Sequence, residues 1–338
     1  MSKFSFFFLI FALFIPSGIY GQSTANTKSF DPGAKQSALT EQPMSLETPS
    51  GVLYGTLLLP KSRLHYPIVL IIAGSGPTDR NGNSPVFSGP NDSLKMLAEG
   101  LAANGIASLR YDKRGIGESA TAMGKEADLR FDSYINDAVS WSKKLRQDKR
   151  FTTLTIVGHS EGSLIGMVAS QGKNADGFVS LAGAGRPAGQ IILDQVRPQL
   201  PPDLMRSAEE IVAALEAGKD AASVPPSLNA LFRPSVQPYI KSWFQYDPAR
   251  EMAKLSIPVL IAQGTTDIQV SVEEAKLLAK AKPSAQLLIV EGMNHVLKQV
   301  PSERDQQIRS YSDPSLQIVP QLVNDTAKFV KKAKRQKP

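Results

Sequence analysis

The chain contains no cysteine and only three histidines among its 338 residues. The absence of cysteine excludes disulfide bonds, thiol nucleophiles, cysteine-bound metal ions and a lipid attached to an N-terminal cysteine. Stability therefore has to come from a hydrophobic core. The scarcity of histidine restricts any catalytic imidazole to His65, His159 or His295.

Long apolar runs are also missing, apart from one near the N-terminus. The stretch from Phe4 to Ile15 holds 12 mostly apolar residues, follows Lys3 and precedes a small-residue region at 16–21. A membrane span needs about 20 apolar residues, so this stretch is short for one. We predict a signal peptide over residues 1–21 that is cleaved on export, and hence a secreted or periplasmic protein without stable membrane insertion. An uncleaved membrane anchor is the alternative.

Excess charge is absent from the body of the chain. The net charge of +7 arises from Lys3 and from six basic residues among the last eleven, so residues 4–327 are electrically balanced. The basic tail at residues 331–338 is typical of a solvated helix end. No basic stripe with interleaved aromatic residues occurs, which argues against nucleic acid as a partner.

Short apolar runs alternate with amphipathic segments along most of the chain. We expect strands near residues 52–59, 68–73, 106–111, 154–157, 178–182, 258–263 and 285–290. We expect helices near residues 93–104, 133–146, 163–169, 203–217 and 234–244. This alternation predicts an α/β fold, in which a mostly parallel central sheet is covered by helices on both faces.

Two segments break the alternation. Residues 22–45 are polar and lack periodicity, so we interpret them as a flexible lead-in. Residues 186–254 are rich in proline and show no clear strand. We interpret them as a helical cap inserted into a core of residues 46–185 and 255–330, above the strand ends where open α/β sheets bind ligands. A surface excursion is the alternative.

The five residues Gly158-His159-Ser160-Glu161-Gly162 join an expected strand to an expected helix. In this context Gly-x-Ser-x-Gly is typical of a nucleophile elbow, a sharp turn that exposes a serine hydroxyl above the sheet edge. The glycines remove Cβ atoms that would collide in such a turn. We predict that Ser160 is a nucleophile and that the N–H of Glu161, at the start of the helix, is half of an oxyanion hole.

A serine hydroxyl needs a base, which is most often a histidine. His159 lies inside the elbow and is expected to point away from Ser160, whereas His65 lies in a loop before an expected strand. His295 lies in a loop that directly follows the strand at 285–290. We therefore predict that His295 is the general base.

A carboxylate should hold that histidine, and it should follow a strand between the serine and the histidine in chain order. Asp267 meets both conditions because it comes directly after the strand at 258–263. Asp194 and Asp247 are alternatives within the cap segment, and both are better explained as solvated or capping residues. We predict that Asp267 is the orienting acid.

The segment after the second strand, Ala73-Gly74-Ser75-Gly76-Pro77, offers backbone N–H groups without bulky side chains. We predict that the N–H of Ser75 is the second oxyanion donor, with a glycine turn that binds no ligand as the alternative. Arg80 follows in a polar run and is expected to pair with an acidic loop residue or with substrate. The apolar cap residues Trp243, Phe244 and Leu231 are expected to contact a short or medium acyl group.

Taken together, four segments resemble the α/β-hydrolase superfamily: Gly158–Gly162, Tyr111–Ser119, Gln263–Asp267 and Gly292–His295. The run from Gly74 to Asn83 is similar to a bacterial branch of carboxylesterases close to the serine aminopeptidase-like hydrolases. The resemblance covers about residues 50–330 and implies the α/β-hydrolase fold. It also implies a triad of Ser160, Asp267 and His295, with Ser75 and Glu161 as oxyanion donors. One departure is Ala73-Gly74, where many relatives have His-Gly.

These features predict an exported serine esterase that cleaves a small-molecule acyl ester through an acyl-enzyme, without a metal or an organic cofactor. One alternative is a peptidase that acts on short peptides, in which Glu161, Glu209 or Glu210 would bind the substrate amine. Another is a binding protein on a hydrolase scaffold that has lost turnover.

Overall fold

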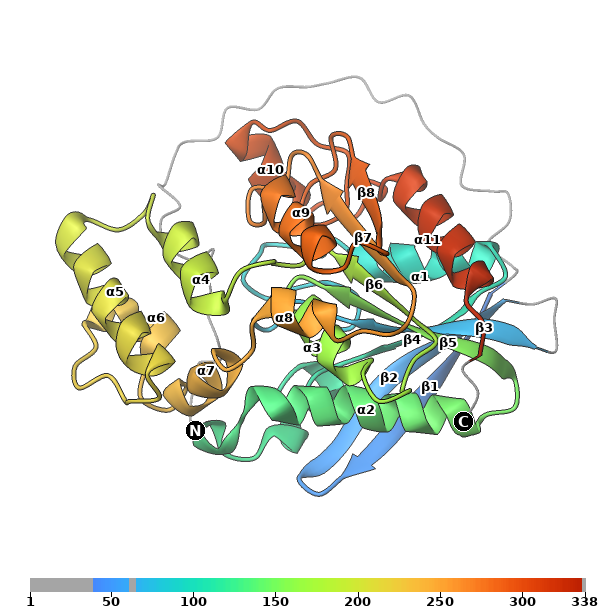
Figure 1. The fold of residues 1–338 in the computed structure, drawn as a ribbon, viewed down its shortest axis with the longest axis horizontal. Coiled ribbons are helices and arrows are strands. Elements are labelled where there is room, and N and C mark those ends of the chain that lie inside the picture. Colours follow the sequence, from blue (N-terminus) through green and yellow to red (C-terminus); the bar gives the residue numbers. More distant parts are fainter. Residues whose placement is uncertain (1–38, 61–64, 336–338) are drawn as a thin grey trace.

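Residues 39–60 and 65–335 are described by the computed structural model (Figure 1). Their strands form one sheet with the order β1-β2-β4-β3-β5-β6-β7-β8. The strand β2 pairs antiparallel with β1 and β4, and all pairings from β4 to β8 are parallel. The strands are β1 (Leu39–Thr48), β2 (Gly51–Pro60), β3 (Tyr66–Ile72), β4 (Ala107–Tyr111), β5 (Phe151–His159), β6 (Gly177–Leu181), β7 (Val259–Gly264) and β8 (Gln286–Val290).

Helices cover both faces of this sheet, as the sequence predicts. The helices α1 (Ser93–Ala103) and α11 (Pro320–Lys332) pack together on one face. The other face is covered by α2 (Phe131–Gln147), α3 (Glu161–Ala169), α8 (Pro248–Ala253) and α9 (Val272–Ala281) (Figure 1). A further helix, α10 (Arg304–Ser310), and the 3-10 helices η2 (Gly117–Met123) and η3 (Glu126–Asp128) lie in connections.

The central strands are buried because helices cover them on both sides. From Ile68 to Ile72 no side chain of β3 is more than 1% exposed. Alternate residues of this strand belong to two separate apolar clusters, one under α2 and α3 and the other under α1 and α11. A nearly continuous apolar run is therefore what a parallel strand in this position requires.

The segment expected to be a flexible lead-in, residues 22–45, needs correction. Its last seven residues belong to β1, which pairs along its whole length with β2. The strand is an edge strand with one half-buried face, so exposed residues such as Pro43 and Ser45 alternate with half-buried ones such as Met44 and Leu46. This weak alternation, together with Pro43, hides the strand from a search for apolar runs. The remainder of the lead-in and the predicted signal peptide lie outside the described residues.

The insertion between β6 and β7 is helical, as expected for a cap. It contains α4 (Ala188–Val196), α5 (Pro202–Glu216), η4 (Pro226–Leu228), α6 (Asn229–Phe232) and α7 (Gln237–Trp243), followed by α8. The helices α5 and α7 correspond to the two that the sequence predicts. Figure 1 shows α4, α5 and α6 at one side of the sheet, with α7 next to α2.

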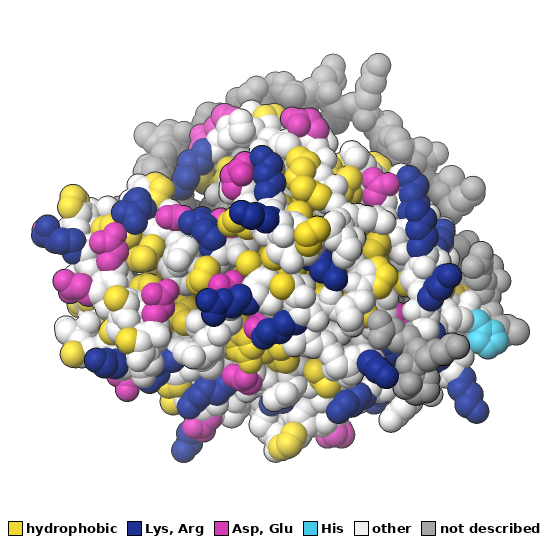
Figure 2. Space-filling model, viewed as in Figure 1, with side chains coloured by type: hydrophobic (Ala, Val, Ile, Leu, Met, Phe, Trp, Pro, Cys, Tyr) yellow, Lys and Arg dark blue, Asp and Glu magenta, His cyan; other side chains and the backbone are white. Residues whose placement is uncertain are grey.

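Charged side chains are mixed on the molecular surface. Figure 2 shows Lys and Arg side chains interspersed with Asp and Glu over the face in view, in keeping with the balanced charge of residues 4–327. Of the basic tail, Lys331 and Lys332 lie at the exposed end of α11. Within residues 39–60 and 65–335, no helix combines the length and the apolar character that crossing a membrane requires.

Candidate active site

The turn between β5 and α3 has the geometry of a nucleophile elbow. Ser160 has φ 54° and ψ −121°, a conformation that costs energy for any residue with a side chain. Its N–H donates to the carbonyl of Leu181 on β6 at 2.8 Å, which ties the turn to the sheet. A Cβ on Gly158 would lie 2.1 Å from the Gly162 carbonyl oxygen, and a Cβ on Gly162 would lie 2.4 Å from that of Ile72. Both glycines are therefore steric requirements of the turn.

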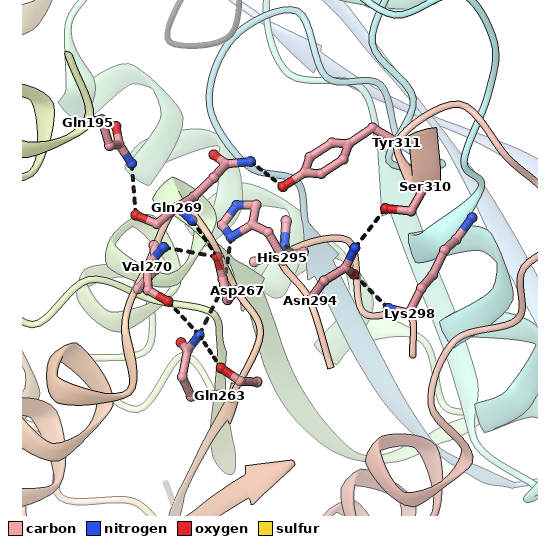
Figure 3. A network of polar contacts seen from close by, with 12 residues as sticks. Gln195, Gln263, Asp267, Gln269, Val270, Asn294, His295, Lys298, Ser310 and Tyr311 are labelled. Atoms are coloured by element: carbon pink, nitrogen blue, oxygen red, sulfur yellow. Dashed lines mark hydrogen bonds and ion pairs between the residues drawn. The ribbon is translucent and has the colours of Figure 1, made fainter. Parts of the chain in front are cut away.

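Asp267 and His295 are joined in the way the sequence predicts (Figure 3). Asp267 lies in the loop after β7 and His295 in the loop after β8, two strands that are neighbours in the sheet. The Nδ1–H of His295 donates to Oδ2 of Asp267 at 2.8 Å, and the two side chains are 6% and 0% exposed. A carboxylate can only accept here, so the hydrogen bond leaves Nε2 of His295 as the proton-accepting atom.

The Asp267 carboxylate is held by three further donors. Its Oδ1 accepts from the backbone N–H groups of Gln269 at 2.8 Å and Val270 at 2.9 Å. Its Oδ2 also accepts from Nε2 of Gln263 at 3.0 Å (Figure 3). Burial alone would raise the pKa of Asp267, but the interaction with His295 and the two backbone hydrogen bonds outweigh burial and lower it. The group therefore stays ionised inside the protein.

The loop that carries His295 is fixed from both sides. The Nε2–H of His159 donates to the carbonyl oxygen of His295 at 2.8 Å, so the His159 side chain supports the loop that carries the base. Burial and the nearby His295 lower the pKa of His159 to about 3. On the other side, Asn294 donates to Oγ of Ser310 at 2.7 Å and accepts from the N–H of Lys298 at 2.9 Å (Figure 3).

Ser160 lies where two cavities meet. The first is lined by Ser160, Glu161 and, from the cap, Ile192 and Trp243. The second is lined by Ser160 and His295 together with the polar loop around Thr78. The structure thus brings Ser160 and His295 to one cavity. Within residues 65–335, which include both, no hydrogen bond joins the two side chains.

The two predicted oxyanion donors lie next to Ser160. Ser75 lines both cavities, and Glu161 begins α3 beside Ser160 in the first. Among the described residues, neither backbone N–H donates a hydrogen bond to another backbone group. A Cβ on Gly74 would lie 3.2 Å from Cβ of Ser160, so the Gly74 segment packs closely against the elbow. This arrangement is compatible with an oxyanion hole.

Arg80 is not placed to bind substrate, which corrects half of the expectation for it. Its guanidinium donates to Oδ2 of Asp112 at 2.8 Å and pairs with Glu118, and it lines neither cavity at Ser160. Its backbone N–H also donates to Asp112, at 2.8 Å. Arg80 therefore ties the polar run to the loop after β4, which is the acidic-loop pairing that the sequence left open.

The two aromatic cap residues behave differently. Trp243 lines the first cavity with Ser160, as expected. Phe244 packs against the main apolar cluster and Leu231 is buried within it, and neither lines that cavity, which corrects the expectation for both. The next residue along a helix points about 100° away, so two neighbouring aromatic residues cannot share one face of the cap.

The rejected alternatives for the acid and base have other roles. His65 is exposed, Asp194 pairs with Arg186 at 2.9 Å, and Asp247 caps α8 by accepting from the N–H of Arg250. Sequence reasoning missed Lys113 and Tyr239, whose side chains contact Glu161 beneath the elbow. Within the described part of the chain, no group of three His, Asp or Glu residues could hold a metal ion.

Several solved structures share the architecture of this chain. Est1E from Butyrivibrio proteoclasticus is 18% identical, with 86% of this chain and 98% of that chain covered, at a TM-score of 0.56. The esterase PF2001 from Pyrococcus furiosus is 16% identical over 93% and 99%, at 0.54. The α/β hydrolase GrgF from a Penicillium species is 19% identical over 87% and 99%, also at 0.54. The chain has the α/β-hydrolase fold.

Sequence comparison also relates the chain to α/β hydrolases. The model of the family described as serine aminopeptidase, S33, matches residues 91–223, a range that includes Ser160 but neither Asp267 nor His295. Esterase EstD of Thermotoga maritima is 29% identical over 250 residues, which are 72% of this chain and 58% of EstD. The chain therefore spans a little over half the length of this curated relative. The resemblance to the esterase branch of the α/β hydrolases is confirmed.

Proposed function

We propose that the protein is a serine hydrolase that cleaves carboxylic esters through an acyl-enzyme on Ser160. The observation that carries the proposal is the buried Asp267–His295 pair, whose histidine lines one cavity with a serine in the strained conformation of a nucleophile elbow. The similarity to Esterase EstD supports the choice of esters.

The proposed reaction has two halves, formation of an acyl-enzyme and its hydrolysis, and the same residues act in both. Oγ of Ser160 attacks the ester carbonyl carbon as its proton passes to Nε2 of His295, and Asp267 stabilises the imidazolium. The N–H groups of Ser75 and Glu161 bind the oxyanion. His295 then gives the proton to the leaving alkoxide, which departs as an alcohol. Water then loses a proton to His295 as its oxygen attacks the acyl carbon. His295 returns that proton to Oγ of Ser160 as the bond between Oγ and the acyl carbon breaks, which releases the acid and restores the serine hydroxyl.

Each of the two cavities is assigned to one half of the substrate. The leaving alkoxide must receive its proton from His295, so the alcohol half has to occupy the cavity that His295 lines. The acyl half is left with the other cavity, whose walls include the apolar side chains of Leu164, Ile192 and Trp243. We infer a preference for short or medium apolar acyl groups.

A peptidase activity is less well supported by the site. The three carboxylates considered for an amine site are engaged or remote: Glu161 pairs with Lys113 at 2.8 Å, Glu209 pairs with Arg197 at 3.3 Å, and Glu210 is exposed. We expect turnover of p-nitrophenyl acyl esters to exceed that of aminoacyl p-nitroanilides. A preference for the anilides would favour the peptidase.

The test of the proposed function is the variant Ser160→Ala, assayed with p-nitrophenyl esters of increasing acyl length. Removal of the nucleophile should lower kcat by at least about a thousandfold while the protein remains folded. A folded variant that retains more than about a tenth of the activity would refute the proposal. A wild-type protein without turnover on esters, amides or lactones would favour the binding-protein alternative.

We also propose that the protein is exported by the segment at residues 1–21. The composition of this segment supports the proposal. Expression of the full chain in a bacterium, followed by fractionation and N-terminal sequencing, should yield a secreted or periplasmic protein that begins at Gln22. Recovery of the intact chain in the membrane fraction would favour the anchor.

A further inference from the structure

A buried ammonium group contacts both of the segments that carry the oxyanion donors. Nζ of Lys113 donates to Oε2 of Glu161 at 2.8 Å and to the carbonyl oxygen of Gly74 at 2.5 Å. The Lys113 and Glu161 side chains are only 2% and 5% exposed. Burying two charges is costly unless they are paired and fully hydrogen-bonded. A buried ion pair is therefore weak evidence for a stabilising role, and another role has to be considered.

The contact with Gly74 bears directly on Ser75. The carbonyl of Gly74 and the N–H of Ser75 belong to one planar trans peptide group, in which C=O and N–H point in opposite directions. A hydrogen bond that holds the carbonyl toward Lys113 therefore directs the N–H of Ser75 away from Lys113. It also polarises that N–H, because hydrogen bonds in a chain strengthen one another.

The contact with Glu161 fixes the other donor. Glu161 is the first residue of α3, and its own backbone N–H is the other proposed oxyanion donor. Its carboxylate has one oxygen on Lys113 and the other on the cap, where the hydroxyl of Tyr239 donates to Oε1 at 2.5 Å. Burial and the Glu161 charge raise the pKa of Tyr239 above its usual range, so the phenol keeps the proton that it donates.

Tyr239 connects this cluster to the seating of the cap. It lies on α7 one helical turn before Trp243, so both side chains lie on the same face of the helix. The Phe131 ring on α2 stacks on Trp243 at 5.8 Å and lies 6.1 Å from Tyr239. The docking of α7 on α2 therefore sets both a cavity wall and a hydrogen bond to Glu161.

We propose that Lys113 and Tyr239 are positioning residues for the oxyanion hole. Lys113 fixes the Gly74–Ser75 peptide and the first residue of α3. Because Tyr239 lies on the cap, its hydrogen bond to Glu161 makes this arrangement depend on the packing of α7 against α2. Neither side chain reacts with substrate. This inference rests on the proposed esterase function.

The charge of Lys113 has a second effect. A carboxylate on Glu161 without a counter-ion would oppose the negative charge that develops beside it in the transition state. Removal of the ammonium should therefore harm catalysis more than removal of the ammonium and the carboxylate together. This difference separates an effect on the oxyanion from a general loss of packing.

The experiment compares kcat and KM for p-nitrophenyl esters among Lys113→Met, the double variant Lys113→Met with Glu161→Gln, and Tyr239→Phe. Loss of one oxyanion donor costs about 10²–10³ in kcat, so misplacement of both should cost Lys113→Met about 10² with little change in KM. The double variant should recover at least about threefold of that loss. Tyr239→Phe, which deletes a single hydroxyl, should lower kcat by about 3–10-fold.

Glu126→Gln is the matched control for Tyr239→Phe. Glu126 lies on η3 and accepts from Arg233 and Ser235 of the cap, so the variant weakens another contact between cap and core. It should leave kcat within about twofold of wild type. An equal loss of kcat in Glu126→Gln and Tyr239→Phe would overturn the inference, because it would indicate general loosening of the cap.

Two further results would also overturn the inference: wild-type kcat in folded Lys113→Met and Tyr239→Phe, or a loss confined to KM. If Lys113→Met does not fold, the comparison of kcat between Tyr239→Phe and its control Glu126→Gln tests the inference. Ser160→Ala is assayed in parallel. An esterase that depends on Ser160 but is indifferent to Lys113 and Tyr239 refutes only this inference, whereas no turnover in wild type refutes the proposed function.

Discussion

Replacement of Asp267 by asparagine should inactivate the enzyme while preserving its fold. The carboxylate accepts two backbone hydrogen bonds on Oδ1 and two side-chain hydrogen bonds on Oδ2, from His295 and Gln263. The backbone donors cannot turn away, so the asparagine oxygen should take the place of Oδ1. Its NH2 group then faces His295, which has to accept on Nδ1 and carry its proton on Nε2.

A histidine protonated on Nε2 cannot take the proton of Ser160. We therefore expect Asp267→Asn to lower kcat by about 10³–10⁴, which corresponds to about 4–5.5 kcal/mol in the activation free energy. The assay is the initial rate of p-nitrophenyl ester hydrolysis, with thermal unfolding by circular dichroism to show that the variant is folded.

The matched control is Asp247→Asn, which makes the same change at the N-cap of α8. Asparagine caps helices as well as aspartate does, so this variant should keep wild-type kcat within about twofold. The reasoning would be refuted by a folded Asp267→Asn variant that retains more than about a tenth of wild-type kcat.

Three further changes test the fold and the supporting contacts. Gly158→Ala places a Cβ 2.1 Å from a backbone oxygen and should cost more than about 4 kcal/mol in urea unfolding, whereas a loss below about 1 kcal/mol would contradict the steric argument. His159 has its pKa lowered to about 3, so between that pH and about 6.5 the unfolded chain binds more protons and stability rises with pH. His159→Gln should therefore show a shallower rise than wild type in that range, by up to about 1.4 kcal/mol per pH unit, and equal slopes would count against a buried neutral imidazole. Arg80→Met should lower stability by about 1–3 kcal/mol and leave KM unchanged, and a raised KM would restore a role in substrate binding.

The sequence predicts the parallel core and the elbow because both have strong local signatures. A buried parallel strand such as β3 is apolar throughout, and the Gly158 and Gly162 positions tolerate no side chain. The Asp267–His295 contact is predictable for a different reason: the chain offers few histidines, and the carboxyl ends of β7 and β8 are neighbours.

Features that depend on long-range partners could not be predicted in this way. The edge strand β1 owes its order to pairing with β2, and Arg80 turns to the loop after β4 because Asp112 and Glu118 lie there. Lys113 lies in a turn motif that is recognisable by its glycines. Its hydrogen-bond partners, Gly74 and Glu161, are 39 and 48 residues away in the chain. No local pattern reports such contacts, or shows which of two neighbouring aromatic residues faces the cavity.

Covalent labelling with a fluorophosphonate, followed by mass spectrometry of the proteolysed protein, tests the central claim most directly. The predicted result is a single phosphonate adduct on the peptide that contains Ser160, formed in parallel with the loss of esterase activity. Full inactivation with the adduct on another residue, or an active esterase in which Ser160 stays unlabelled, would contradict the assignment of Ser160 as the nucleophile.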